Sequence, residues 1–164
     1  MELRVKANTL QATKFLKGIS RKQVSATQKS LNRVSNMAVL MITKRTQSGK
    51  LPDNQRMEPY AKSTKKDRKD RGRQTGFVDL TDTGKMFRSL DFKQSGFKNT
   101  LFFSNIERAK IAAQHDFFGV GKRKTKRPFF SIGNDEEEKL KNEFAKFYFS
   151  AVGIWAKEKT LLTI

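Results

Sequence analysis

His115 is the only histidine in the chain, so any acid–base or metal chemistry that uses an imidazole would have to involve it. A metal site needs further ligands at suitable spacing, and the sequence around His115 has no such cluster of histidine, aspartate and glutamate. The neighbouring Asp116 would point in another direction in either a helix or a strand. A catalytic triad would need a placed serine and acid, and no motif places them. We therefore expect His115 to be a structural or surface residue.

Two other segments contain residue types that can do chemistry. Gly119-Val120-Gly121 followed by Lys122 is similar to part of a phosphate-binding loop, but the GxxxxGK[ST] spacing and the preceding apolar strand are missing. It predicts a hairpin turn. Glu136 to Glu138 could do acid–base work, but three acids in the first turn of a helix are explained by the helix dipole. The sequence therefore predicts no enzyme activity, no metal and no cofactor.

The composition limits the class of protein further. The chain has 164 residues, which is enough for one domain with one core, and the absence of cysteine excludes disulfides and thiolate chemistry. The N-terminal sequence lacks the apolar core of a secretory signal, and no run of about 18 apolar residues could span a bilayer. We expect a single domain, residues 1–164, in a reducing compartment and without membrane contact.

The net charge of +19 comes from 35 lysines and arginines against 16 acids, which favours a polyanion or an acidic protein as partner. Two segments concentrate the positive charge and are candidates for contact with DNA or an acidic partner. Their basic residues are Lys62, Lys65, Lys66, Arg68, Lys69, Arg71 and Arg73, then Lys122, Arg123, Lys124, Lys126 and Arg127. A solvated loop explains the first segment equally well, and charge alone does not decide between the two.

The N-terminal half reads as mostly helical. Residues 1–6 alternate as in a short strand, although a frayed terminus fits as well. A short helix follows from about residue 9, ended or kinked by Gly18, and a second helix capped by Ser20 runs from about 21 to 47 with one apolar stripe. Gly49 predicts its end. Residues 50–77 lack apolar periodicity and predict a basic, flexible loop with a short helical turn after Pro59.

The second half predicts a small sheet between helices. A short helix capped by Thr81 or Asp82 continues to Leu90, and two strands follow, residues 92–95 and 98–104, joined by a Ser-Gly turn. A helix at 107–115, an edge strand at 129–132 and a final helix capped by Asn134 or Asp135 complete the chain. The predicted fold is α+β: an antiparallel sheet of three or four strands packed against a long N-terminal helix and a C-terminal helix.

Several short motifs occur in an order that resembles a known family. They are PYAKSTKK at 59–66, LTDTGKMFRSL at 80–90, IAAQHDFFG at 111–119 and RPFF at 127–130. In this order they resemble the tail-completion or virion-morphogenesis proteins of tailed bacteriophages, which include the phage Mu G protein-like family and related siphophage neck and minor tail-component proteins. The residues that match the motifs are Leu80, Thr83, Gly84, Phe87, Leu90, His115, Gly119, Arg127, Pro128 and Phe129.

The resemblance implies a non-enzymatic structural subunit that forms a ring, a hexamer, at the head–tail junction of a virion. The implied partners are other copies of the chain, the connector or stopper proteins of the neck, the terminator protein of the tail, and the genomic DNA passing through. Assembly would take place in the host cytoplasm. The alternative is a free, sequence-independent nucleic-acid-binding protein, which explains the charge but not the motif order. A nuclease is disfavoured because no clustered metal-binding carboxylates are seen.

Overall fold

The computed structural model describes residues 9–153, so the expected strand at 1–6 lies outside the described residues. In chain order the elements are α1 (Thr9–Gln47), α2 (Lys62–Asp70), α3 (Lys85–Arg88), β1 (Leu90–Ser95), β2 (Lys98–Phe103), α4 (Ile106–Ala113), the π-helical turn η1 (Gln114–Phe118) and α5 (Asn134–Val152). The α+β class predicted from the sequence is confirmed.

The N-terminal part of the described chain is one continuous helix of 39 residues, α1. The predicted break at Gly18 is wrong, because a glycine costs an exposed helix only about 1 kcal/mol relative to alanine and does not by itself end it. The predicted end is correct. Gly49 takes a positive φ of 78°, and a side chain there would come within 2.9 Å of the Phe77 ring. Glycine therefore closes the helix both by conformation and by space.

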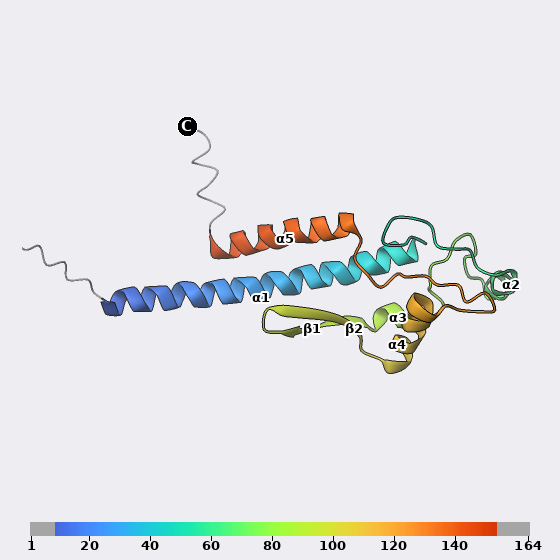
Figure 1. The fold of residues 1–164 in the computed structure, drawn as a ribbon, viewed down its shortest axis with the longest axis horizontal. Helices are drawn as coiled ribbons and strands as arrows, with labels where there is room; N and C mark the ends of the chain where they lie inside the picture. The colour runs from blue at the N-terminus through green and yellow to red at the C-terminus, as the bar shows by residue number, and fades with distance from the viewer. Residues whose placement is uncertain (1–8, 154–164) are drawn as a thin grey trace, which may run out of the picture.

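Helix α5 runs along one side of α1, and the β1–β2 hairpin runs along another side (Figure 1). The last helix therefore packs on the first helix. The expected caps Asn134 and Asp135 are wrong, because both residues lie inside the helix and Gly133 is the N-cap. The Glu136 carboxylate accepts the Gly133 N–H at 3.0 Å, which satisfies a backbone donor that the helix itself cannot. No residue of α5 is buried.

The two-stranded hairpin is confirmed. β1 and β2 are antiparallel with Ser95 opposite Lys98, and Gly96 in the turn has a φ of 59°. Leu101 and Phe103 lie on the half-buried face while Phe102 is 38% exposed, as their alternation predicted.

The prediction of three or four strands is not confirmed, because only two strands occur among residues 9–153. The segment 129–132 was predicted as an edge strand, but side chains take its backbone hydrogen bonds. The Phe130 N–H donates to the Asp116 carboxylate at 2.9 Å, and Arg45 donates to the carbonyls of Phe129 and Ser131 at 2.6 and 2.8 Å. With those groups satisfied, a neighbouring strand is not needed to pair them.

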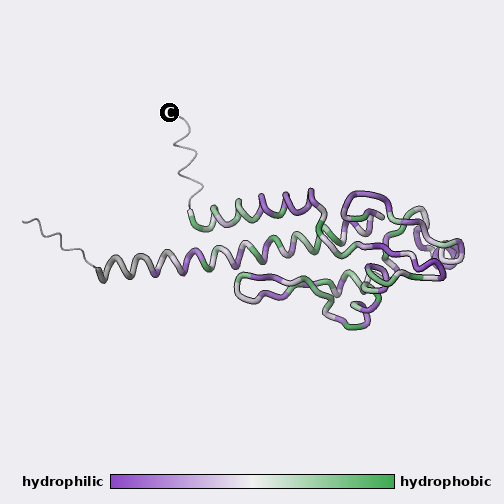
Figure 2. Tube along the Cα trace, viewed as in Figure 1, coloured by the Kyte–Doolittle hydropathy of each residue, from purple (hydrophilic) through white to green (hydrophobic). Residues whose placement is uncertain are grey.

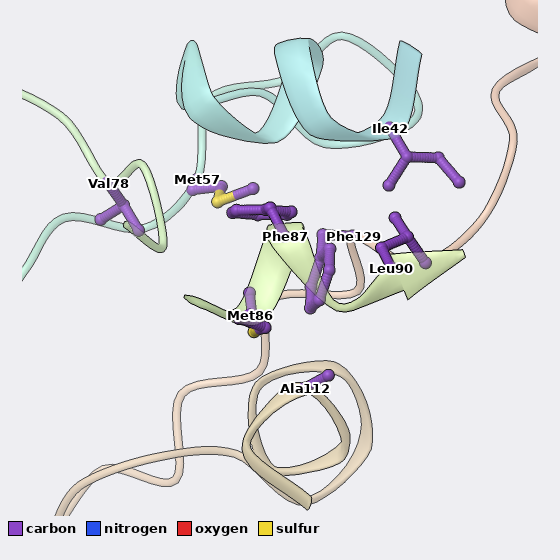
Figure 3. Packing of buried hydrophobic residues seen from close by; sticks show 8 residues of the cluster. All are labelled: Ile42, Met57, Val78, Met86, Phe87, Leu90, Ala112 and Phe129. Atoms are coloured by element: carbon purple, nitrogen blue, oxygen red, sulfur yellow. The ribbon is translucent and has the colours of Figure 1, made fainter. Parts of the chain in front are cut away.

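A small core fills the space between α1, α3 and α4. Figure 3 shows Ile42 of α1 and Ala112 of α4 on opposite sides of Phe87 and Phe129. Phe129 is fully buried and meets Phe87 edge-on, with 6.0 Å between ring centroids. The complete cluster is Ile42, Met57, Val78, Met86, Phe87, Leu90, Ala112 and Phe129.

The short helix α3 begins later and ends earlier than predicted. Its N-cap is Gly84, with a φ of 71° and no side-chain cap, so the expected caps Thr81 and Asp82 are wrong. Leu90 belongs to β1 instead of the helix. The stretch 50–77 also holds more regular structure than a loop, because residues 62–70 form α2.

Candidate functional site

Ten of the twelve candidate basic residues are exposed on the surface of the chain. Helix α2 arranges four of them, because residues three and four apart share one face of a helix. The stripe along α2 consists of Lys62, Lys65, Lys66 and Lys69. Arg71 and Arg73 follow just after the helix and are also exposed. The end of the molecule that carries α2 is largely hydrophilic in Figure 2.

The other four exposed cations sit on a tight turn. Val120 and Thr125 exchange backbone hydrogen bonds of 3.0 and 3.1 Å, which closes the turn predicted from the glycines. A side chain at Gly119 would come within 2.1 Å of the Lys124 carbonyl oxygen, so the closed turn requires glycine there. The turn displays Lys122, Arg123, Lys124 and Lys126 to solvent. These residues and the α2 stripe are the exposed cationic surfaces.

Arg68 was a candidate contact residue, but its side chain lies inside the protein. It is 4% exposed, and its guanidinium donates to both Asp79 carboxylate oxygens at 3.0 and 3.1 Å. It also lies over the Tyr60 ring, whose hydroxyl donates to Asp79 at 3.0 Å. Burial first, and Asp79 second, raise the pKa of Tyr60 to about 12. Arg68 therefore anchors α2 to the chain and is not available to a partner.

Arg127 was also a candidate contact residue, but its side chain is buried, with only 4% of the residue exposed. The Arg127 guanidinium donates to the Glu58 carbonyl at 3.2 Å, and the Arg127 backbone N–H donates to the His115 carbonyl at 2.7 Å. Burial and the nearby Arg127 charge lower the pKa of His115 to about 4. His115 is therefore a neutral, half-buried residue at neutral pH.

The ten residues that match the family motifs occupy different environments. Phe87, Leu90 and Phe129 are buried in the core, and Arg127 ties the segment 127–129 to the chain. Gly84 and Gly119 supply backbone with positive φ, of 71° and 82°. Leu80, Thr83, Gly84 and His115 line one pocket, whereas Pro128 is exposed.

That pocket, which we call the basic pocket, has a volume of about 380 Å³ and lies between α2, the segment 80–86, and α4 with η1. Its apolar wall is formed by Tyr60, Leu80, Met86 and Ile111. Its charged wall has four cations and one carboxylate, Arg68, Arg71, Lys85, Arg108 and Asp82. Sequence reasoning missed the pocket, because its walls come from three separate segments, residues 60–71, 80–86 and 108–115, with no common motif.

Not all of the cations in the basic pocket are neutralised. Arg71 pairs with Asp67 and, at 2.6 Å, with Asp82. Among residues 9–153, neither Lys85 nor Arg108 forms an ion pair. The pocket therefore keeps an excess of positive charge. His115 lines it, and the Nδ1 atom of this residue is buried and lacks a hydrogen-bond partner within the described chain.

The backbone of the pocket rim is strained at one position. Leu80 has a φ of 48°, a left-handed conformation that is uncommon for residues other than glycine. It is held by its neighbours: the Thr81 N–H donates to the Asp79 carboxylate at 2.9 Å. The Asp79 carboxylate thus accepts hydrogen bonds from Arg68, from Tyr60 and from the Thr81 N–H of the strained turn. These contacts hold Leu80 in its position in the pocket wall.

Arg45 is a structural residue that the sequence analysis missed. It is a basic residue near the end of the first long helix with no sequence signal of burial, but it is 7% exposed and pairs with Glu136 of α5. Burial, partly offset by Glu136, lowers its pKa. The acids at the start of α5 were attributed to the helix dipole alone, and no sequence signal linked Glu136 to a residue 91 positions earlier.

The described chain offers no clear place for metal chemistry or a membrane span. Among residues 9–153, no three histidine, aspartate or glutamate side chains lie close enough to hold a metal ion. No helix in this range is both long and apolar enough to cross a bilayer. Comparison of the chain with protein families, with curated proteins and with solved structures finds no match.

Proposed function

We propose that the protein is a structural subunit of the head–tail junction of a tailed bacteriophage, where copies close into a hexameric ring around the passing DNA. The observation that carries the proposal is the meeting of the family-motif segments. Segments 80–90 and 127–129 share one core through Phe87 and Phe129, and segments 80–90 and 111–119 share one pocket through Leu80 and His115, although they are separated in the sequence. Motifs that together build one packed unit are consistent with a structural subunit.

The surface supports the same role. Ten exposed cations occupy two places, α2 with the residues after it and the 122–126 turn, where neighbouring acidic proteins or DNA phosphates could be met without reading sequence. Helix α5 packs on α1 and has no buried residue, which leaves surface that a neighbouring subunit could cover. Ring formation, neck partners and DNA passage all need such surfaces.

A charge-reversal experiment tests the proposal. Lys122, Arg123 and Lys124 are changed together to glutamate in the phage that carries the gene, and infectious particles and packaged DNA are measured. We expect assembly or DNA retention to fail. The matched control reverses three exposed cations at the far end of α1, Lys17, Arg21 and Lys22, and should leave more particles infectious. Normal particles from the turn variant would contradict the proposal, as would absence of the protein from purified particles.

A free nucleic-acid-binding protein is the second candidate, favoured by the density of exposed cations on α2 and the 122–126 turn. The two candidates differ in their salt response. A free binder should shift duplex DNA with an affinity that falls steeply as salt rises, while a ring subunit should bind DNA weakly at physiological salt. A band-shift titration between roughly 50 and 200 mM salt distinguishes the two candidate functions.

A further inference from the structure

The basic pocket borders the α2 surface, with which it shares Arg71, but neither of the proposed roles needs a ligand in it. It is a cavity of about 380 Å³, whereas the lysines of the α2 stripe and the cations of the 122–126 turn are exposed and do not line it. This volume is at the lower end of the range in which proteins bind small ligands or side chains of a partner, about 300–1,000 Å³. We propose that the basic pocket binds an acidic peptide segment of a partner protein, with an apolar side chain of the peptide seated in the pocket.

The charge of the pocket lining indicates which charge a ligand should carry. Of the charged side chains that line the pocket, four are cationic and one, Asp82, is anionic. Arg68 is neutralised by Asp79 and Arg71 by Asp67 and Asp82, but Lys85 and Arg108 have no acidic partner in the described chain. Two unneutralised cations at the edge of a partly buried site favour carboxylates from outside.

The apolar wall indicates whether the ligand is a peptide or a nucleic acid. Tyr60, Leu80, Met86 and Ile111 form about a third of the lining residues, and the main chain around Gly84 leaves room beside them. A nucleic-acid backbone has no apolar side chain to fill such a wall. A peptide offers both carboxylates and an apolar side chain. The exposed cationic surfaces are the better place for DNA.

An unpaired polar atom supports the presence of a ligand. The His115 Nδ1 atom is buried and lacks a partner, and His115 lines the pocket. Buried polar groups are nearly always hydrogen-bonded, because leaving one unpaired costs about 1–3 kcal/mol. The inference concerns the pocket of a single chain and stands whether or not copies form a ring.

Peptide binding can be measured directly with the purified chain. The probe is a fluorescein-labelled peptide, Glu-Glu-Leu-Phe-Glu-Glu, titrated by fluorescence anisotropy at physiological salt. We expect saturable binding, lost when glycines replace the two apolar residues and when lysines replace the glutamates. Binding of the glycine peptide as tightly as the parent would overturn the proposal, because the apolar wall would then contribute nothing.

Variants of the chain locate the site. The double variant Lys85→Glu with Arg108→Glu should weaken binding about tenfold or more, equivalent to about 1.4 kcal/mol. The control Lys93→Glu with Lys98→Glu makes the same change of charge at exposed positions on the hairpin and should change the affinity by no more than about twofold. Equal weakening by both pairs would mean general attraction to a basic protein and would overturn the proposal.

A steric variant avoids any dependence on charge. Thr64 lines the pocket from the exposed face of α2, so Thr64→Trp places an indole in the pocket and should abolish binding without altering the net charge. Circular dichroism of each variant checks that the fold is kept. An unlabelled DNA duplex is added as competitor: if it displaces the peptide, and Thr64→Trp removes DNA binding too, the pocket is a nucleic-acid site and the peptide proposal fails.

Discussion

Two regions of this protein differ in how they are held together. The core end comprises residues 42–132 around Phe87 and Phe129, where eight apolar residues are buried in one cluster. The helix arm comprises α5 and the part of α1 that it contacts, where α5 carries aromatic side chains but buries no residue. Stability is therefore concentrated at the core end, while the helix arm keeps apolar surface that a second protein could cover. The variants below test how sharp that division is.

Truncating one aromatic in each region should give the largest contrast. Phe129→Ala removes a fully buried ring from the core end and should lower the free energy of unfolding by about 4 kcal/mol. Phe144→Ala removes a half-buried ring that stacks on Tyr148 in the helix arm, and should cost about 1 kcal/mol. Urea unfolding of both variants measures the two values. Similar losses would mean that the two regions unfold as one equally packed unit.

Arg45 joins the two regions, because it pairs with Glu136 at the start of α5 and donates to the carbonyls of Phe129 and Ser131. Arg45→Met leaves a carboxylate and two carbonyls without their donor, and should cost about 3 kcal/mol. Arg33→Met removes an exposed arginine that lies 3.7 Å from the Phe147 ring centre in the arm, and should cost about 1 kcal/mol or less.

The Arg45 prediction has an internal check. Adding Glu136→Gln to Arg45→Met removes the uncompensated charge, so the double variant should be more stable than Arg45→Met alone. Thermal unfolding followed by circular dichroism gives the comparison. A double variant that is less stable than the single variant would show that the ion pair is not what the Arg45 substitution disturbs.

The pH dependence of stability reports on the core end, since His115 is the only histidine in the chain. Its pKa is lowered to about 4 in the folded protein, against 6.5 as the ordinary value. As pH falls below 6.5 the unfolded chain takes up a proton that the folded chain does not, so stability decreases from pH 6.5 towards 4. The slope reaches about 1.4 kcal/mol per pH unit for one proton.

His115→Gln removes this proton uptake from the unfolded state. Between pH 6.5 and 4, unfolding free energies of the natural protein should therefore fall more steeply than those of the variant, while above pH 6.5 the two curves should run parallel. Urea titrations at a series of pH values give both curves. Parallel curves throughout would place His115 in a solvent-like environment and contradict its burial beside Arg127.

The smallest expected effect concerns the part of α1 beyond the core end. Gly18 lies within the helix, and a side chain there would meet nothing within 4 Å. Gly18→Ala should stabilise this turn by up to about 1 kcal/mol through helix propensity. Amide hydrogen exchange of residues 15–25 should slow, while the global unfolding midpoint should barely change. A large change of the midpoint would show that this part of the helix unfolds together with the core end.

Local signals determined much of the architecture. The Ser-Gly turn between alternating residues specified the hairpin and its faces, because the period of a strand and the turn glycine act within a few residues. Gly49 marked the end of α1, and the glycines at 119 and 121 marked the closed turn. Each of these is a conformational requirement of a single position, which a sequence displays directly.

Only the tertiary structure decided which charged residues are internal. Arg45, Arg68 and Arg127 look the same in the sequence as their exposed neighbours, yet their partners Glu136, Asp79 and the Glu58 carbonyl lie 91, 11 and 69 residues away. The missing third strand has the same origin, since side chains at Asp116 and Arg45 took the hydrogen bonds of the segment 129–132. The basic pocket likewise exists only where distant segments meet. Sequence patterns report on neighbours along the chain, whereas burial and ion pairing depend on neighbours in space.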